Sequence, residues 1–270
     1  MKVLWLFAHP EQRSLNASLR DDGIRALEEL GHETRLSDLY AMGWNPVVDR
    51  SDYRRGSHTG AGADTDADER FLVARHSKRA YEAGELSDDI RAEQEKLLWA
   101  DTVVLQFPLW WHGMPAILKG WFDRVLVKGF AYGIPDPQAP GRSLRYGDGG
   151  LAGRRAMVLV TAGATAAGFG PRGVNGDINE LLFPVQHGAF WYMGMSVVPP
   201  FIVTSADRVS EVGYVEYREL AGRLRERLLA IPTAEPIPFR RQNSGDYDDD
   251  LVLRDTIAPG QSGLHVHTVR

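Results

Sequence analysis

The sequence predicts an α/β fold in which a doubly wound parallel sheet carries helices on both faces. Apolar runs of strand length alternate along the chain with amphipathic segments of helix length, which is typical of a parallel sheet covered by helices. A chain of 270 residues buries roughly 70–75% of its unfolded surface. It contains no cysteine, which excludes disulfides, thiolate metal sites and cysteine nucleophiles.

Five segments are predicted as strands. The first is too short to be the apolar part of a signal peptide, and a buried strand fits it better. Pro108 is expected to end the third strand, because a proline cannot donate to the ladder. The predicted strands are Val3–Ala8, Glu33–Leu36, Thr102–Phe107, Ala156–Thr161 and Ser196–Val203.

Helices are predicted between and after these strands. Gly31 suits the end of the first helix, and Ser87 caps the second, ahead of two acidic residues that favour its dipole. Residues 43–63 are expected to form a long excursion outside the core, and residues 133–150 a Gly/Pro loop. The predicted helices are Ser14–Leu30, Ser87–Ala100, Pro115–Val127, Gly176–Phe190 and Val215–Ile231.

The composition changes after residue 231. We expect one domain over residues 1–231 and an irregular C-terminal extension over residues 232–270, which contains four prolines and the acidic run Asp248–Asp250. Such an extension is either disordered or wrapped around a partner subunit.

The net charge and the lengths of the apolar segments argue against two classes of protein. The net charge is −5, with 31 basic and 36 acidic residues, which argues against a nucleic-acid-binding protein, because that needs a basic face. No segment approaches membrane length, so we expect no membrane insertion and a cytoplasmic protein.

Two candidate metal sites are rejected. Asp64–Glu69 imitates the start of an EF-hand calcium loop, but Glu69 and Arg75 occupy the positions that require Gly and Glu. His265 and His267 alternate like strand neighbours, and a solvated terminus is a simpler interpretation than a metal pair.

The most informative feature is an aromatic strand end. Trp110, Trp111 and His112 follow the third strand directly, and ligands of open α/β sheets bind at the carboxyl ends of strands. This arrangement predicts a flat aromatic ligand. The alternative is a packed turn in which the tryptophans only fill space.

Two further strand ends suit a cofactor. Arg13, Ser14 and Asn16 follow the first strand, where the N-terminus of a helix with hydroxyl and amide groups makes a phosphate site; the alternative is a plain helix cap by Ser14. The glycine-rich stretch 161–170 lets the backbone approach a ring edge such as that of a flavin, or is simply a flexible surface loop. The chain has neither a G-x-G-x-x-G fingerprint nor a G-x-S-x-G elbow.

Five stretches of the chain together resemble a known family. They are Asp38–Met42, Leu86–Gln94, Gln106–Arg124, Phe130–Tyr132 and Gly176–Asn179, and the sequence around them resembles the NAD(P)H:quinone oxidoreductases of the DT-diaphorase type over most of residues 1–225. The resemblance implies a flavodoxin-like fold, a homodimer with active sites at its interface, and tightly bound FAD rather than FMN. It also implies a ping-pong cycle, in which NADPH or NADH gives hydride to the flavin and a quinone-like acceptor then takes it in the same pocket.

The resemblance also assigns residues to the site. Around the phosphates it places His9, Arg13, Ser14, Leu15, Asn16 and Ser18. Along the flavin it places Pro108, Leu109, Trp110, Trp111 and Phe169, with Thr161, Ala162, Gly163 and Ala164 at its polar edge. The substrate pocket is implied to be walled by Trp111, His112, Tyr132 and the partner's Tyr192.

The chain departs from the family where a proton relay is expected. Phe169 and Asn175 stand where the family has a tyrosine and a histidine, and neither can titrate. Asn175 can still donate a hydrogen bond to a flavin or quinone oxygen. Ile134 replaces a second pocket tyrosine. His112 replaces a phenylalanine and either supplies the proton or only packs on the ring.

Three functions are therefore weighed. The first is an FAD-dependent two-electron reductase of quinone-like compounds. The second keeps the flavin in a specialised pathway enzyme that acts on a polycyclic quinone, a nitro group or an azo group. The third is a non-catalytic regulatory subunit with a flavodoxin-like fold, in which the C-terminal extension is a docking arm.

Overall fold

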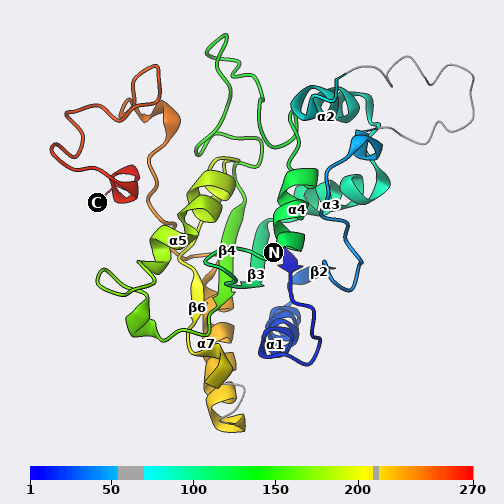
Figure 1. The fold of residues 1–270 in the computed structure, drawn as a ribbon, viewed down its shortest axis with the longest axis vertical. Helices are drawn as coiled ribbons and strands as arrows, with labels where there is room; N and C mark the ends of the chain where they lie inside the picture. Colours follow the sequence, from blue (N-terminus) through cyan, green and yellow to red (C-terminus); the bar gives the residue numbers. More distant parts are fainter. Residues whose placement is uncertain (54–69, 209–212, 270) are drawn as a thin grey trace, which may run out of the picture.

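The computed structural model describes residues 1–53, 70–208 and 213–269 (Figure 1), and confirms the doubly wound parallel sheet. The strand order is β2-β1-β3-β4-β5, with β6 also paired to β4, and every pairing is parallel. The strands are β1 Lys2–Phe7, β2 Glu33–Asp38, β3 Thr102–Pro108, β4 Arg155–Thr161, β5 Ser196–Val197 and β6 Phe201–Val203.

The last predicted strand is two strands in the structure. β5 pairs with the first residues of β4 and β6 with its last three. Pro199 and Pro200 lie between them and cannot donate to a ladder, so a single strand over Ser196–Val203 was wrong. Pro108, by contrast, is the final residue of β3 and pairs with Thr161.

Helices cover both faces of the sheet, as Figure 1 shows. Successive side chains of a strand point to opposite faces, and two separate apolar clusters result. One contains Trp5 and Phe7 with side chains from α1 and α7; the other contains Leu4 and Leu6 with side chains from α3, α4 and α5. These helices are α1 Leu15–Glu29, α3 Asp88–Trp99, α4 Ala116–Val125, α5 Ile178–Val185 and α7 Tyr214–Ala230.

Two helical regions differ from the prediction. Helix α2, Val73–Ala83, was missed, and its polar sequence buries only Ser77 and Ala80. Helix α5 begins at Ile178 because Asp177 caps it, and at Gln186 it changes into a π-helix that runs to Trp191. Short 3₁₀ turns occur at Arg50–Tyr53, Ala166–Gly168, Gln242–Ser244 and Leu264–His267.

The first part of the predicted excursion belongs to the core, because Trp44 and Tyr53 are buried. The buried guanidinium of Arg124 binds Asp52 at 2.6 Å and lies 4.6 Å from the Trp44 ring centroid. Gly120 makes room for this segment, since a Cβ there would lie 2.3 Å from Pro46. The segment is thus anchored to α4. The EF-hand-like residues Asp64–Glu69 lie outside the described part of the chain.

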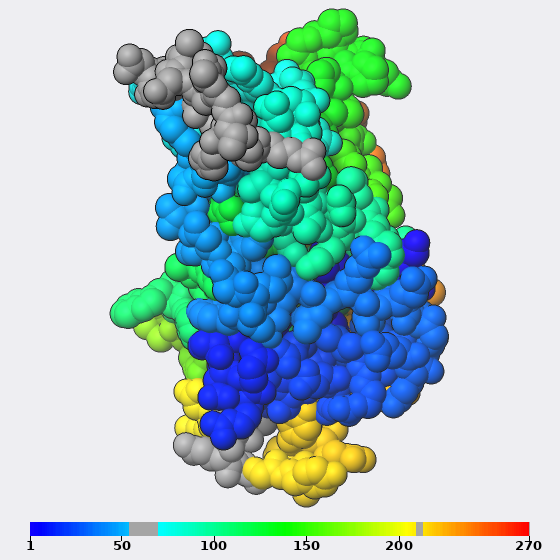
Figure 2. Space-filling model, turned by 90° about the vertical axis from the view of Figure 1, so that its right-hand side faces the viewer, coloured from blue at the N-terminus to red at the C-terminus, as the bar shows by residue number. Residues whose placement is uncertain are grey.

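The C-terminal residues after 231 have no helix beyond 3₁₀ turns within the described part, and they run beside α5 (Figure 1). The Ile237 N–H donates to the Val197 carbonyl at 2.7 Å, and Phe239 forms an antiparallel bridge with Thr268. In Figure 2 the first third of the chain, blue to cyan, covers one side of the molecule, with α7 in yellow at the lower end. In the described residues, no helix is both long and apolar enough to cross a bilayer.

Candidate active site

A cleft lies at the carboxyl edge of the sheet, where β1 and β3 are neighbours. The chain leaves β1 toward α1 on one face and β3 toward α4 on the other, and this divergence is where open α/β sheets bind ligands. The cleft has a volume of about 280 Å³. Its lining is His9, Ser14, Leu15, Asn16, Pro108, Leu109, Trp110, Thr161, Gly163, Ala206 and Asp207.

A buried chain of hydrogen bonds supports the floor of this cleft. The Trp5 indole N–H donates to Gln106 Oε1 at 2.8 Å, and Gln106 Nε2 donates to the Asn16 carbonyl at 2.7 Å. The Asn16 side-chain amide then contacts Thr161 Oγ1 at 3.0 Å. Because these groups are buried and mutually paired, they join β1, β3 and β4 to the first turn of α1.

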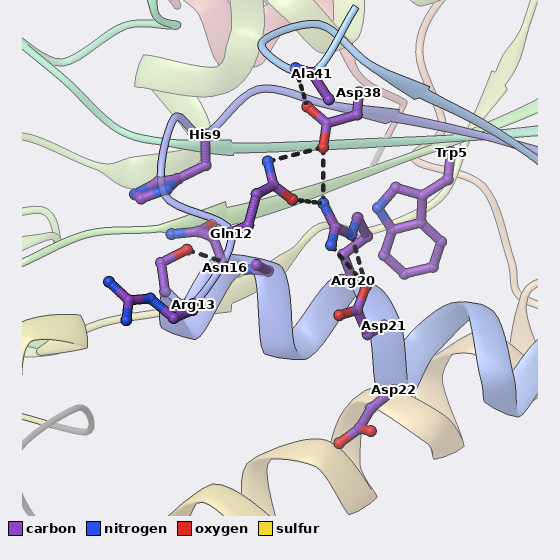
Figure 3. A network of polar contacts seen from close by, with 12 residues as sticks. Trp5, His9, Gln12, Arg13, Asn16, Arg20, Asp21, Asp22, Asp38 and Ala41 are labelled. Carbon is purple, nitrogen blue, oxygen red and sulfur yellow. Dashed lines mark hydrogen bonds and ion pairs between the residues drawn. The ribbon is translucent and has the colours of Figure 1, made fainter.

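A second buried network braces the loop between β1 and α1 (Figure 3). Arg20 and Asp38 form an ion pair at 2.8 Å, with both side chains 8% exposed. Gln12 lies between them: its amide N–H donates to Asp38 Oδ2 at 3.0 Å, and its Oε1 accepts from Arg20 at 2.7 Å. The position of the loop is therefore set by the protein itself.

The N-terminus of α1 forms one wall of the cleft. Ser14 caps the helix by accepting from the Ala17 N–H at 3.1 Å, and the first N–H groups of a helix carry the positive end of its dipole. His9 is half-buried; burial lowers its pKa, and its Nδ1 accepts from the Glu11 N–H at 3.1 Å. This wall suits an anion such as a phosphate.

Two residues assigned to the phosphates lie away from this wall. The Arg13 side chain is 90% exposed and pairs with Glu11 at 3.3 Å, and hydrogen bonds from Arg13 lower the pKa of Glu11. Ser18 faces a separate groove between α1 and α7, beside Tyr217.

The aromatic rim is a tight turn that projects from the cleft. Trp110 and Gly113 exchange both backbone hydrogen bonds, at 3.0 and 2.9 Å. Between them Trp111 and His112 both have left-handed backbones, with φ of 50° and 58°, a conformation that costs non-glycine residues roughly 1–2 kcal/mol each. Trp110 lines the cleft, whereas Trp111 is fully exposed. The turn therefore presents the exposed Trp111 indole on a strained backbone.

The loop after β4 closes the third side. Gly163 lies against Asp207, since a Cβ there would be 2.8 Å from Asp207 Oδ2. The Ala162 carbonyl accepts from the Ala206 N–H at 3.0 Å, and the Ala164 carbonyl from the Ser205 N–H at 2.9 Å. Sequence reasoning missed Ala206 and Asp207, although they follow a strand that ends at the same edge.

Phe169 and Asn175, the residues at the relay positions, share one folded loop. The Asn175 N–H donates to the Gly168 carbonyl at 3.1 Å, and its side-chain nitrogen would lie 2.8 Å from a Cβ at Gly168. The Phe169 ring packs on the core. Neither residue lines the cleft.

Tyr132 and Tyr192 lie at the opposite edge of the sheet. Tyr192 comes shortly before Ser196, which pairs with Arg155 at the start of β4, whereas the cleft is at Thr161, the end of the same strand. Six strand steps separate these edges, about 20 Å. Burial and the nearby Tyr192 raise the pKa of Tyr132. One chain therefore does not bring these tyrosines to its own cleft.

Comparison with known proteins agrees with this architecture. The model of a flavodoxin-like fold family matches residues 1–228. Human ribosyldihydronicotinamide dehydrogenase [quinone] is 38% identical over 237 residues, which cover 88% of this chain and 94% of that protein. This chain belongs to the NAD(P)H:quinone oxidoreductase family.

Further relatives are similar to this chain over different shares of its length. Rat NAD(P)H dehydrogenase [quinone] 1 is 40% identical, with 76% of this chain and 69% of that protein covered. A ribosyldihydronicotinamide dehydrogenase-like protein of Penicillium crustosum is 41% identical, with coverage of 99% and 96%. The crystal structure of a Klebsiella pneumoniae protein assigned as a quinone reductase covers all of both chains, with 47% identity and a TM-score of 0.91. The similarity to these last two includes the C-terminal residues.

Proposed function

We propose that this chain is an FAD-dependent two-electron reductase that uses NADPH or NADH to reduce a quinone-like acceptor by a ping-pong mechanism. The observation that carries the proposal is the cleft at the β1–β3 divergence, in a member of a family whose relatives are named as quinone dehydrogenases. A bound flavin supplies hydride transfer, which the side chains alone cannot perform.

The residues present fit a flavin. The α1 N-terminus with Ser14, Leu15 and Asn16 suits the phosphates, and Pro108, Leu109 and Trp110 offer an apolar wall to the ring. Gly163 lines the cleft, and its lack of a side chain leaves room for Asp207 beside it. The β4 loop can therefore present its backbone to the polar edge of a ring. FAD is the flavin we propose, and FMN is the alternative.

The proton supply differs from the family pattern in this proposal. Phe169 and Asn175 do not titrate, so Asn175 contributes at most a hydrogen bond. His112 stands on the exposed turn beside Trp111 and is the imidazole nearest in sequence to the aromatic rim. We assign it the role of proton donor to the acceptor.

We further propose that the active form is a homodimer in which each cleft is completed by the partner. Trp111 is fully exposed in one chain, and Tyr132 and Tyr192 lie at the opposite edge of their own sheet. The resemblance implied a contribution from the partner's Tyr192 only; the position of Tyr132 extends this to both tyrosines.

The cofactor proposal is tested on protein purified in its native form. We expect a yellow protein that releases FAD on denaturation, is bleached by NADPH or NADH in the absence of oxygen, and is reoxidised by a quinone. Parallel initial-rate lines over varied quinone concentrations would support the ping-pong order. Protein that neither carries flavin nor takes up FAD or FMN overturns the proposal.

Mixed dimers test the shared site. Neither a Trp111→Ala chain nor a Tyr192→Ala chain should support full quinone reduction alone. Co-expressed with different tags and purified as heterodimers, the two chains restore one intact site, so about half of the wild-type activity is expected. A mixture no more active than either parent contradicts the shared site.

A further inference from the structure

Tyr146 occupies a constrained position beside Tyr192. It is one of few non-glycine residues with a left-handed backbone in the described chain, with φ of 46°. Its ring stacks on His187 with centroids 4.9 Å apart and meets Tyr192 edge-on at 5.1 Å. Its N–H donates to the Tyr192 carbonyl at 3.0 Å. Tyr146 thus fixes Tyr192 through both ring and backbone.

The π-helix brings His187 and Tyr192 to the same ring. The Tyr192 N–H donates to the His187 carbonyl at 3.0 Å, a five-residue step. His187 is buried, and its ring is sandwiched between Tyr146 and Phe183, whose centroid lies 4.4 Å away. Such π-helical turns are frequent at functional sites.

The C-terminal segment holds this arrangement from outside. Gln242 is buried; its N–H donates to the Tyr146 carbonyl at 3.2 Å, and its Oε1 accepts from Arg145 at 2.8 Å. The Trp191 indole N–H donates to the Arg240 carbonyl at 3.1 Å. We call residues 237–244 the strap.

We infer that Tyr146 is a positioning residue for Tyr192 in the acceptor pocket, and that the strap keeps Tyr146 in its left-handed conformation. This inference rests on the proposed function, because it concerns the tyrosine that the partner chain offers to the cleft. Strained backbones persist only where their surroundings over-determine them. Here the stack on His187 and the strap at Gln242 supply that constraint.

The geometry predicts a selective effect on the acceptor. Tyr146 is remote from the cleft proposed for the cofactor, because its backbone and ring contact Tyr192 at the amino edge of the sheet. Loss of its ring should raise KM for the acceptor while flavin content and the rate of flavin reduction by NADPH stay unchanged. A purely structural role would lower flavin content and active fraction together.

The test compares ring variants in the holoenzyme. Tyr146→Ala and the bulkier Tyr146→Leu are expected to raise KM for a benzoquinone about three- to tenfold, the worth of one aromatic pair. Tyr146→Phe keeps the ring and should restore the wild-type KM. The matched control is Tyr217→Ala, which removes a half-buried tyrosine from the cluster on the other face of the sheet and should leave KM unchanged.

The strap is tested at Gln242. Gln242→Ala removes the side-chain acceptor for Arg145 and should raise the acceptor KM as Tyr146→Leu does, whereas Gln242→Glu keeps an acceptor there and should remain close to wild type. Tyr192→Ala tests the proposed pocket separately from the positioning role of Tyr146. If it leaves KM unchanged, the proposed pocket is wrong; if it raises KM while Tyr146→Leu does not, the positioning inference is overturned.

Discussion

The floor and the rim of the cleft are built in opposite ways. The floor is a set of buried polar groups, from Trp5 to Thr161, whose partners are all within the chain. The rim is the turn from Trp110 to Gly113, which two backbone bonds between these residues close. Within it Trp111 has a left-handed backbone and is fully exposed. The floor is complete in one chain, whereas the rim presents a surface that only a ligand or a partner can cover.

The largest expected effect tests the second buried network, which braces the loop between β1 and α1 beside the floor. Arg20→Ala leaves the buried carboxylate of Asp38 without its cation, and removing one member of a buried ion pair costs about 3–5 kcal/mol. Urea unfolding measures it. The control is Arg25→Ala on the same helix, whose side chain is 63% exposed in its pair with Asp22, so about 0–1 kcal/mol is expected. Equal losses of unfolding free energy in the two variants would contradict the view that burial makes the Arg20 pair the stronger one.

A smaller loss is expected at the centre of the floor. Gln106→Leu keeps the volume but leaves the Trp5 indole N–H buried without a partner and removes the Gln106 donor from the Asn16 carbonyl, which keeps its bond within α1. The two losses together cost about 2–4 kcal/mol. Flavin affinity should fall as well, because Asn16 lies in the first turn of α1. The exposed Gln261→Leu provides the control, and an equal loss of stability there would contradict the role of the network.

The aromatic cluster around His187, at the amino edge of the sheet, provides a test by pH, because His187 is buried. Burial and, to a smaller extent, the neighbouring His267 lower the pKa of His187 to about 4. Between pH 6.5 and 4 the unfolded chain binds a proton that the folded chain does not, so the unfolding free energy falls as the pH falls through this window. The loss should be about 2–3 kcal/mol. His187→Phe should flatten this slope, and an unchanged slope would show that other groups cause it.

The smallest effect on stability is expected at the rim. Trp111→Ala removes an exposed ring, so the unfolding free energy should change by no more than about 0.5 kcal/mol. The kcat/KM for a quinone should nevertheless fall about tenfold, because an aromatic wall of the pocket is lost. If stability falls as far as in Arg20→Ala, the rim is part of the scaffold and the contrast with the floor is false.

Sequence reasoning located the fold and the cleft because both follow from local patterns. Apolar runs marked the central strands to within a residue or two, and Trp110 and Asn16 lie at strand ends that topology brings together. The sequence pattern missed α2, since a helix that buries only Ser77 and Ala80 leaves almost no apolar periodicity.

The remaining errors concern relations between distant segments. Asp207 reaches the cleft only because β6 pairs with the end of β4. Tyr132 lies at the far edge, near Tyr192, and burial together with this neighbour raises its pKa. Arg124 ends the family-like stretch Gln106–Arg124, yet it anchors Asp52 and does not line the cleft. Motif similarity alone does not separate residues that bind a ligand from residues that hold the fold together.

The π-helical turn at Gln186–Trp191 makes the length of this segment as important as its composition. Each residue of a regular helix turns the chain by about 100°. If these same six residues formed ordinary α-helix, Tyr192 would be rotated by roughly a quarter turn away from Tyr146 without altering any side chain in the cluster. For homologous chains, a gap of one residue in this stretch would therefore predict an ordinary α-helix that still presents Tyr192 in the same direction, whereas loss of the π turn at unchanged length would predict a differently shaped pocket, even where every aromatic residue is retained.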